Sequence, residues 1–372
     1  MKVLITLLFT LLLISACGTA EEVHAEEINE PSFPVDTLTI TNYIGVELGD
    51  STNTFGIIVD AEYHLGTGNI LILDSGAACF KEYTPTTEYI RQISRQGSAP
   101  GELSSMTFDF FQMGGNVLAL NALKQGFVVF DDTLNYLEEI SNWPQMPPMQ
   151  CVGLGDSVFA AYKPDFSEAG EGEFVMYRRI VTYDYGAEEH SLVLWEDSTE
   201  LSLSDLIRDN SFFITDLLQG ATLTGNSDII LFSLRESEDY TVHAWYPDGT
   251  DAFTITMPLE PVPKTEEEIA EEKTYMEGYL SQMGAQGMSE FTPEPYHDMV
   301  YSVNIGPDGN IWIQRGTLEQ PFFDIFDLEG TLIGHKVLPE AGWTWNFSMS
   351  EFGILAWEDD PELGYQQLFI IE

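Results

Sequence analysis

The feature of this sequence that most constrains its fold is an internal repeat. Each copy begins with a turn residue and continues through a run of alternating apolar residues, a polar gap and a second apolar run that ends in another turn. The four clear copies begin at Gly68, Gly115, Asn226 and Asp308, and two weaker copies begin at Gly155 and Phe352. Because a repeat of this size cannot bury an apolar face alone, we expect the copies to stack on one another.

Each copy predicts three β-strands, joined by Asp-Gly, Glu-Gly or Asn-containing hairpin turns. A short apolar run before each copy adds a fourth, inner strand, and these runs are FGIIVDA, MTFDFF, MQCVGL, ATLTG, YSVNIG and WNFSMS. Four-stranded sheets that recur about every 40 to 50 residues are typical of a β-propeller. We therefore predict an all-β, six-bladed propeller, although the long interval between the third and fourth copies leaves a seventh blade open.

The ends of the chain predict how the ring closes. The last copy lacks an outer strand, whereas residues 36–48 form a spare strand that can pair with LFIIE at the other end. Such pairing removes exposed sheet edges. Residues 197–213 are expected to be a surface excursion after the third blade.

One helix is predicted after the fourth blade, over residues 264–283 of an insert that extends to about residue 290. Thr265 precedes a run of glutamates that suits a helix N-terminus. An approximate apolar stripe favours packing on the propeller over docking of a partner. The stripe consists of Ile269, Tyr275, Met276, Tyr279, Leu280 and Met283.

The N-terminus predicts an address in the cell envelope. Residues 1–16 combine Lys2 with an apolar stretch too short for a membrane span, as in a secretory signal peptide. The small residues before Cys17 resemble the lipobox of bacterial lipoproteins, which implies cleavage before Cys17 and acylation of its thiol. An ordinary signal followed by an unmodified cysteine is the alternative. Residues 17–34 are an acidic tether, and residues 35–372 form the propeller.

Composition excludes one class of partner. The chain has 14 Lys and Arg against 61 Asp and Glu, for a formal net charge of −47, so nucleic acid is excluded. Anionic lipid headgroups repel the body as well, which leaves the lipid on Cys17 as the membrane attachment. Such an excess favours a saline habitat over a specific cationic ligand. Cys79 and Cys151 fall in different copies, so we expect two buried thiols and no metal–thiolate site.

Residues 55–103, FGIIVDAEYHLGTGNILILDSGAACFKEYTPTTEYIRQISRQGSAPGEL, resemble the opening blade of six-bladed β-propeller lipoproteins of Bacteroidetes and related bacteria, which are similar to NHL-repeat proteins. Their blade typically contains Asp-Gly-Asn, then ILD, then G-x-GPGE; here Ala99 replaces a glycine of the last motif. The resemblance covers most of the chain after Asp36, including the acidic helical insert. The resemblance implies the fold much more than the function, because the family largely lacks an assigned activity.

The segment RQGSAPGEL has two interpretations, a phosphate cradle or a link between blades. A cradle needs a glycine-rich turn between a strand and a helix, but Pro100 and the strand-like MTFDFF that follows argue against a helix. We therefore predict a link, in which Gly97 and Gly101 allow the turn and Glu102 accepts backbone N–H bonds. Arg91 and Arg95 are expected to balance neighbouring acids.

No G-x-S-x-G, H-E-x-x-H, P-loop or S-x-x-K motif is present. Propeller enzymes, however, assemble sites from single residues at the inner-strand ends of several blades. Gluconolactonase-like and strictosidine-synthase-like propellers and NHL-type amidating lyases share this architecture. The calcium-dependent types need carboxylates and an amide carbonyl at the channel mouth. With 61 Asp and Glu in the chain, some acids will lie near inner strands by chance, which is the competing interpretation. The candidates near inner strands are Asp60, Glu62, Asp109, His297, Asp298, Asn304 and Asn346.

Three smaller hypotheses concern chemistry at the channel mouth. A Ca²⁺ site would draw on Asp60, Asp109, Asp298 and Asn346. His297 with Asp298 would act as base and orienter, although most such histidines only form a hydrogen bond within a loop. Trp343 and Trp345 would offer a stacking surface for sugar or peptide, although packing between blades is the more common role.

The sequence as a whole predicts a lipid-anchored, extracytoplasmic propeller, periplasmic or surface-exposed, that acts as a binding or scaffold module. Its ligand is unknown and would be a protein, peptide or carbohydrate, engaged on one face of the channel. An enzyme is the less favoured interpretation; it would be a calcium-dependent lactonase or lyase with its site at the channel mouth. A purely structural envelope protein is a third alternative.

Overall fold

The computed structural model describes residues 33–141, 143, 147–170, 173–202, 220–282, 291–316, 320–342, 345–358 and 365–372. The predicted signal peptide, Cys17 and nearly all of the tether lie outside the described residues, as does Trp343. Val35–Glu372 form one compact unit.

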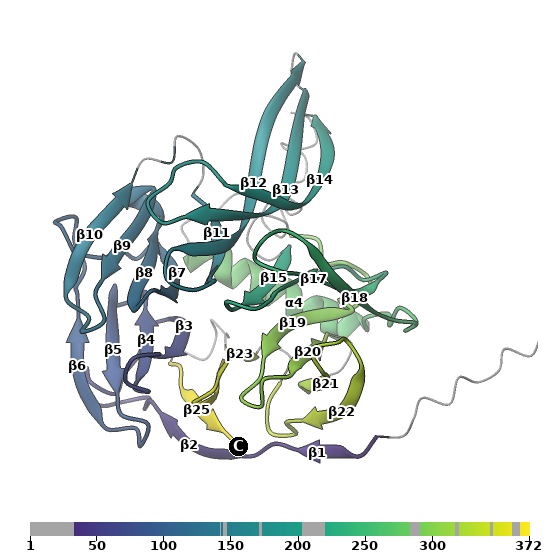
Figure 1. The fold of residues 1–372 in the computed structure, drawn as a ribbon. Helices are drawn as coiled ribbons and strands as arrows, with labels where there is room; N and C mark the ends of the chain where they lie inside the picture. Colours follow the sequence, from purple (N-terminus) through teal and green to yellow (C-terminus); the bar gives the residue numbers. More distant parts are fainter. Residues whose placement is uncertain are drawn as a thin grey trace, which may run out of the picture. The chain divides into compact units, whose positions relative to one another are not determined.

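This unit contains six sheets (Figure 1). Four of them run in chain order from an inner to an outer strand, and the other two take their outermost strand from the N-terminal segment. Blade 1 consists of β3 (Ile58–Tyr63), β4 (Ile70–Asp74), β5 (Cys79–Tyr83) and β6 (Tyr89–Ile93). Blade 2 consists of β7 (Thr107–Met113), β8 (Asn116–Asn121), β9 (Gly126–Phe130) and β10 (Tyr136–Ser141). Blade 3 consists of β11 (Met149–Gly153), β12 (Val158–Gly170), β13 (Glu173–Asp184) and β14 (Leu192–Ser202). A 3₁₀ turn, η1 (Ala122–Lys124), joins β8 to β9.

The second half of the chain repeats the pattern. Blade 4 consists of β15 (Ala221–Gly225), β16 (Ile230–Leu234), β17 (Tyr240–Trp245) and β18 (Asp251–Met257). Blade 5 consists of β19 (Val300–Ile305), β20 (Ile311–Arg315), β21 (Phe322–Phe326) and β22 (Leu332–Val337). Blade 6 consists of β23 (Trp345–Ser350), β24 (Gly353–Glu358), β25 (Leu368–Ile371) and β2 (Ile40–Ile44). Each inner strand contacts the inner strands of both neighbouring blades, β23 also contacting β3, so the ring closes. The predicted six-bladed propeller and its six inner strands are confirmed.

Ring closure uses both ends of the chain, as predicted. Ile40 pairs with Ile371 and Ile44 with Leu368, and the backbones of Thr39 and Glu372 exchange two further hydrogen bonds of 2.8 and 3.0 Å. A second contact was not predicted. The short strand β1 (Val35–Thr37) runs parallel to β22 and adds a fifth strand to blade 5. The N-terminal segment therefore lies along the outer edges of two blades (Figure 1).

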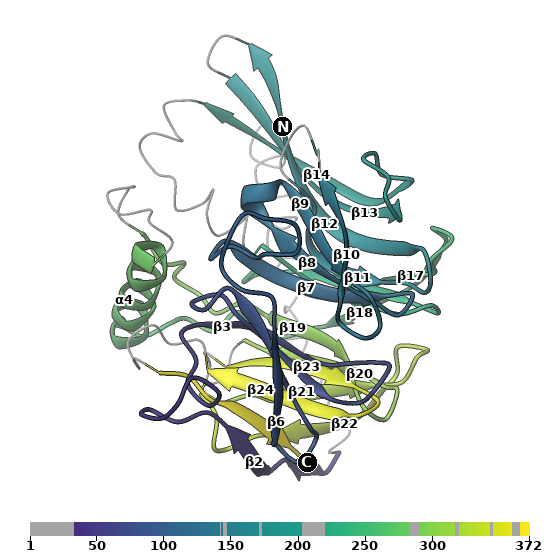
Figure 2. The ribbon, with the colours of Figure 1, turned by 90° about the vertical axis from the view of Figure 1, so that its left-hand side faces the viewer.

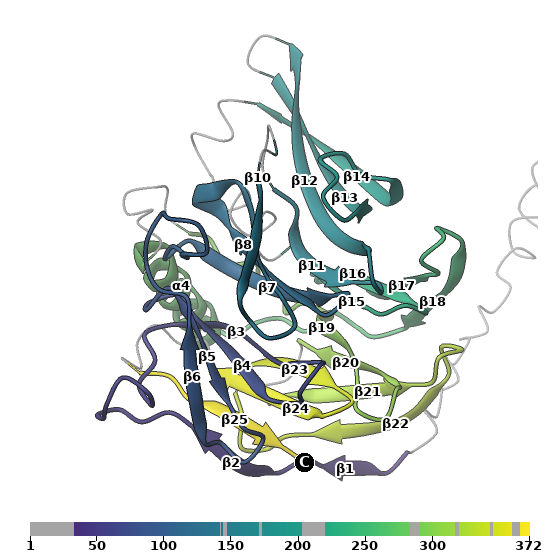
Figure 3. The same ribbon diagram turned by 60° about the vertical axis from the view of Figure 1, so that its left-hand side comes forward.

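The third blade differs from the others in length. Its strands β12, β13 and β14 have 13, 12 and 11 residues, whereas the strands of the other blades have three to seven. Beyond Tyr162, where pairing with β11 ends, the three strands continue as an arm that projects past the other sheets (Figure 3). The surface excursion predicted after the third blade, over residues 197–213, does not begin at residue 197, because residues 197–202 still belong to β14 of that blade; residues 203–213 lie outside the described residues.

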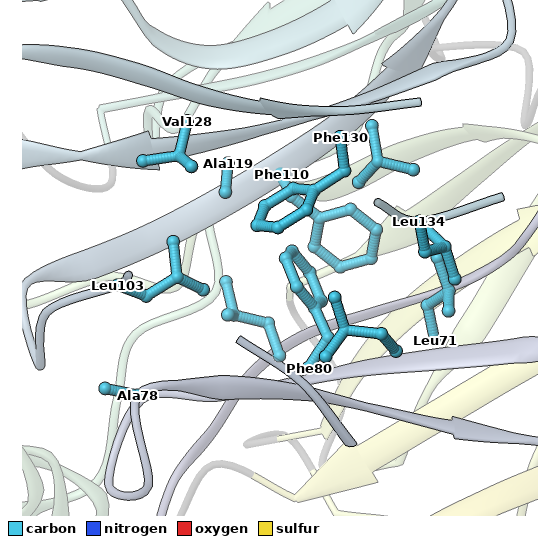
Figure 4. Packing of buried hydrophobic residues seen from close by; sticks show 12 residues of the cluster. Leu71, Ala78, Phe80, Leu103, Phe110, Ala119, Val128, Phe130 and Leu134 are labelled. Atoms are coloured by element: carbon cyan, nitrogen blue, oxygen red, sulfur yellow. The ribbon is translucent and has the colours of Figure 1, made fainter. Parts of the chain in front are cut away.

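The core lies between the faces of adjacent blades. Between blades 1 and 2, the ring of Phe80 meets Phe110 and Phe130 edge-on, with centroids 5.0 and 5.8 Å apart (Figure 4). Leu134 completes this cluster from the β9–β10 turn and is only 4% exposed. Its backbone is left-handed, with φ of 63°, at a turn position that Gly249 and Gly330 occupy in blades 4 and 5. Burial of the leucine side chain, about 2 kcal/mol, offsets that backbone strain.

The predicted helix is confirmed as α4 (Glu266–Gln282), after blade 4 (Figure 2). Thr265 caps it, because its Oγ1 accepts the N–H of Glu268 at 3.2 Å while the Glu268 carboxylate accepts the N–H of Thr265 at 2.6 Å. Met276 of the predicted stripe is buried and Ile269 half-buried. The side chains of Tyr275, Tyr279, Leu280 and Met283 lie outside the described residues.

None of the helices in the described part of the chain has the length and apolar character that crossing a membrane requires. Cys79 and Cys151 are both free and buried, as predicted. Burial raises the pKa of the Cys79 thiol to about 11 and that of Cys151 well above its usual value, so neither is a ready nucleophile.

Candidate functional site

Three carboxyl groups meet where the inner strands of blades 1 and 2 run side by side. Asp60 and Glu62 are two residues apart on β3, so their side chains point to the same side, towards β7. Asp60 accepts the backbone N–H of Phe110 at 3.2 Å. Glu62 accepts the side-chain amide of Gln112 at 2.8 Å. Both acids therefore tie blade 1 to blade 2.

The same kind of tie recurs around the ring. Asp109 on β7 accepts the N–H of Cys151 on β11 at 3.3 Å, which ties blade 2 to blade 3. Thr222 on β15 accepts the N–H of Val303 on β19 at 3.1 Å, which ties blade 4 to blade 5. The irregularities in strand pairing explain part of the pattern, because Asp60 and Asp109 each follow a β-bulge in the inner strand. A bulge redirects the side chain that follows it.

The surroundings of the three acids favour their protonated forms. Burial raises the pKa of Asp60 well above its usual value, and the negative charges of Asp109 and Glu62 raise it further. Burial likewise raises the pKa of Glu62 to about 8, against the bond from Gln112, and that of Asp109 to about 6, against the bond from Cys151. The cluster therefore retains protons near neutral pH.

The predicted calcium ligands do not come together. The structure brings Asp60 and Asp109 close to each other and adds Glu62, but Asp298 lies beside α4, where its charge acts on Glu272. Asn346 is on β23, paired with Trp357 of the same blade. Across the described ranges, no group of three or more His, Cys, Asp and Glu side chains is arranged to hold a metal ion. These residues do not fit a Ca²⁺ site, and we derive no chemistry from one.

His297 and Asp298 lie on the loop that leads into β19. The imidazole Nε2 of His297 is 3.3 Å from the Glu268 carboxylate on α4, and its backbone N–H donates to Val262 at 3.0 Å. The imidazole thus contacts the helix, and its acidic neighbour in space is Glu268. The pair connects α4 to the blade 5 loop.

Two other candidates lie within packed or hydrogen-bonded surroundings. Trp345 is 5% exposed and stacks on Phe369 of β25, with ring centroids 4.4 Å apart. Asn304 donates from its amide to Ser302 on the same strand at 3.3 Å. Trp343 lies outside the described residues, so the second half of the proposed stacking surface is not described.

The link between blades 1 and 2 has the internal hydrogen bonds that the sequence predicted. Glu102 accepts the N–H of Ala99 at 2.9 Å and the Nε–H of Arg95 at 2.8 Å, so the turn encloses its own carboxylate. These bonds, the one from Ala99 first, lower the pKa of Glu102. A methyl group at Gly97 would overlap that carboxylate, so a larger residue there would have to displace Glu102 from its hydrogen bonds. The predicted link is confirmed, and its internal anion occupies the place that a phosphate would take in a cradle.

Beside this link lies an open pocket of about 550 Å³. Its lining combines Arg91 and Arg95 from blade 1 with Phe130, Leu134 and Tyr136 from blade 2. The arginines stood out in the sequence, but the pocket did not, because its second wall comes from residues about 40 positions further along the chain.

The likeness of this chain to known proteins is confined to solved structures. No family model matches the sequence, and neither does any curated protein. A member of the DUF4221 family from Bacteroides vulgatus has a TM-score of 0.50 at 8% identity, covering 90% of this chain and 97% of that one. An exported protein from Bacteroides fragilis has a TM-score of 0.44 at 11% identity, covering 90% and 95%. A gluconolactonase from Xanthomonas campestris has a TM-score of 0.42 at 11% identity, covering 92% and 97%.

This chain is a six-bladed β-propeller. At such identities, likeness to solved structures concerns the fold alone, so the activity of the gluconolactonase is not transferred to this propeller.

Proposed function

We propose that this propeller is a lipid-anchored, extracytoplasmic binding or scaffold module of a bacterial cell envelope. The anchor is the acylated Cys17, and the support for it is the short apolar leader followed by small residues and the cysteine. The acidic tether separates the anchor from the propeller. The partner is a protein, peptide or carbohydrate; nucleic acid is excluded by the charge of −47.

The observation that carries this proposal is the arm of blade 3. Ring closure needs four short strands per blade, yet β12, β13 and β14 continue well past the ring. Ordering a residue costs about 1–2 kcal/mol of backbone entropy, so an ordered arm needs compensating contacts. Side chains at 167–170 near its tip and Ser198 on its outer strand are exposed. An ordered, projecting sheet of this kind offers a surface for a partner.

The test is site-specific photocrosslinking in cells. A crosslinking residue at the exposed Ser198 of the arm is expected to give a discrete product of reproducible mass. The matched control places it at the exposed Glu329, in a hairpin turn of blade 5. No discrete product from Ser198, or the same products from both positions, would overturn the role of the arm.

The alternative, a calcium-dependent lactonase or lyase, has less support. The inner-strand carboxyls Asp60, Glu62 and Asp109 are engaged in ties between blades, and their raised pKa values disfavour the charged forms that bind Ca²⁺. A calcium-dependent enzyme site built from these carboxyls would have to use the same side chains to bind Ca²⁺ and to tie the blades together.

Thermal unfolding tests that alternative. The protein without its leader, with Cys17→Ser to prevent acylation, is compared in EDTA, Ca²⁺ and Mg²⁺ at equal ionic strength. We expect the two cations to act alike, because each only screens charge. A Ca²⁺-specific gain of about 2.7 kcal/mol at 100 times the dissociation constant, absent from Asp109→Asn, would instead establish a calcium site.

A further inference from the structure

We propose that the pocket between blades 1 and 2 binds a small organic anion, a carboxylate or phosphate attached to an aromatic group. The site lies at the outer strands β6 and β10 of the two blades. It does not include the inner-strand acids Asp60, Glu62 and Asp109, nor any residue of the arm. It therefore stands independently of the function proposed above.

Three cationic side chains lie at this pocket, in a chain that has few of them. Of 14 Lys and Arg, Arg91 and Arg95 line the pocket, and Lys124 donates to the carbonyl of Ala99, which also lines it, at 3.1 Å. Glu102 also lines the pocket and pairs with Arg95. Glu82 and Glu139 pair with Arg91 and Lys124, so the charges balance locally, whereas the chain as a whole carries −47. The pocket is thus a place where an anion meets less repulsion than elsewhere.

The two guanidinium groups are held in place while keeping free donors. Arg91 donates from Nε to the buried Glu82 at 2.7 Å and from Nη2 to the carbonyl of Thr133 at 2.8 Å. Arg95 donates from Nε to Glu102, and its side chain is 78% exposed. Within the described residues, neither terminal nitrogen of Arg95 donates a hydrogen bond to protein. Planar forks with open donors suit bidentate binding of a carboxylate or phosphate.

The opposite side of the pocket is apolar. Ile93, Phe130 and Leu134 form a buried floor with 6%, 2% and 4% exposure. The ring of Tyr136 lies directly on the backbone of Gly101, where an added Cβ would come within 2.8 Å of it. Close backbone contact fixes the orientation of this ring. A flat apolar group can lie against this side while its anionic end reaches the arginines.

The size of the pocket sets the size of the ligand. Its volume of about 550 Å³ lies within the range of pockets that hold small molecules, roughly 300–1,000 Å³. Two requirements follow from its lining: a charge for the arginines and a ring for the Tyr136 side. A neutral ring or a bare inorganic ion meets only one of them.

The experiment measures calorimetric binding of four probes at fixed ionic strength: phenyl phosphate, benzoate, benzyl alcohol and inorganic phosphate. We expect phenyl phosphate or benzoate to bind, and benzyl alcohol and inorganic phosphate to bind at least about tenfold more weakly. The comparison of the two anions distinguishes phosphate from carboxylate ligands. If none of the probes binds, the proposal is wrong; equal binding of inorganic phosphate would remove the aromatic requirement and overturn it as stated.

Variants locate the site. Arg95→Gln is expected to weaken binding of the aromatic anion about tenfold or more without altering unfolding, because this side chain is largely exposed. Arg91→Gln removes the ion-pair partner of the buried Glu82, so Arg91→Lys serves as the second variant. Lys273→Gln on α4 removes an equal charge far along the chain and is expected to leave binding unchanged. Unchanged binding in Arg95→Gln would overturn the proposal, whereas crosslinking from Ser198 would be unaffected by that result.

Discussion

At the scale of single residues, the inner-strand acids show that one kind of side chain suits two roles, as a metal ligand or as a hydrogen-bond acceptor between blades. Asp60 and Asp109 lie where a propeller enzyme would place metal ligands, yet each accepts the backbone N–H of the next blade. A carboxyl group that remains protonated near neutral pH can still accept this bond. The ring is therefore held by groups whose charge state depends on pH.

The raised pKa of Glu62 gives a pH dependence of known sign. Its pKa is about 8 in the folded protein against 4.5 ordinarily, so between these values the folded chain binds more protons than the unfolded chain. The free energy of unfolding therefore falls as pH rises through this window. Glu62→Gln keeps an acceptor for Gln112 and is expected to flatten the dependence. Urea unfolding at several pH values checks this; parallel curves for both proteins between pH 5 and 8 would contradict it.

The position of Leu134 leads us to expect an unusual order of stability among its substitution variants. Its left-handed φ strains any side chain, while its burial between blades stabilises the core. Leu134→Ala loses about 2–5 kcal/mol of packing and keeps the strain. Leu134→Gly loses the same packing but relieves about 1–2 kcal/mol of strain. Glycine is thus expected to be at least as stable as alanine here, the reverse of the usual order. Chemical unfolding of both variants measures the difference, and a less stable glycine variant would refute the argument.

At the scale of elements, the sequence predicted those strands, turns and helices whose formation depends on neighbouring residues in the chain. The inner strands and hairpins followed from alternating apolar residues and turn residues such as Gly249 and Gly330. Helix α4 followed from Thr265 and the glutamates behind it. By contrast, β1 was not predicted, because three residues carry no periodic pattern and their partner β22 lies about 300 positions away.

The arm and the pocket escaped prediction for related reasons. The stretch around Gly170 is rich in glycine and glutamate, which favours a loop, and only pairing between β12 and β13 makes it extended. The pocket depends on Tyr136 lying on Gly101, a contact between two blades. The predicted calcium ligands do not come together in the structure. Part of the reason is that sequence places single residues near inner strands but does not show which blade each side chain faces.

The capping box of α4 predicts a local effect. Thr265→Ala removes the cap on Glu268 and is expected to cost about 1 kcal/mol, concentrated in the first turn of the helix. Thr274→Ala is the matched control, because Thr274 lies within the same helix and bonds only the carbonyl of Ala270 in the turn before it. Amide hydrogen exchange should rise at the start of α4 in Thr265→Ala but not in Thr274→Ala. Equal exchange in both would count against the cap.

At the scale of the whole molecule, the N-terminal segment determines whether the ring is closed. Strand β2 completes blade 6 and buries Ile44, whereas β1 only adds an outer edge to blade 5 and is exposed. Loss of each strand should therefore have a different cost.

Two truncations test this difference. A protein that begins at Leu38 lacks β1 and is expected to stay monomeric, with a small loss of stability. A protein that begins at Val46 lacks β2 as well, which exposes the edge of β25 and opens core around Ile44. We expect it to unfold at a clearly lower temperature and to associate through the open edge. Thermal unfolding and sedimentation measure both effects; equal behaviour of the two proteins would show that β2 does not close the ring.

The pairing of β2 with β25 also governs the order of assembly. Ile40 and Ile371 belong to opposite ends of the chain, so the contact closes the longest loop that the propeller contains. A chain made from its N-terminus onward must hold β2 without its partner until β25 has emerged. The first blades can form early, but the sixth cannot, and stalled or C-terminally shortened chains remain open rings. The sixth blade, and with it the closed ring, therefore forms only after β25 has been made.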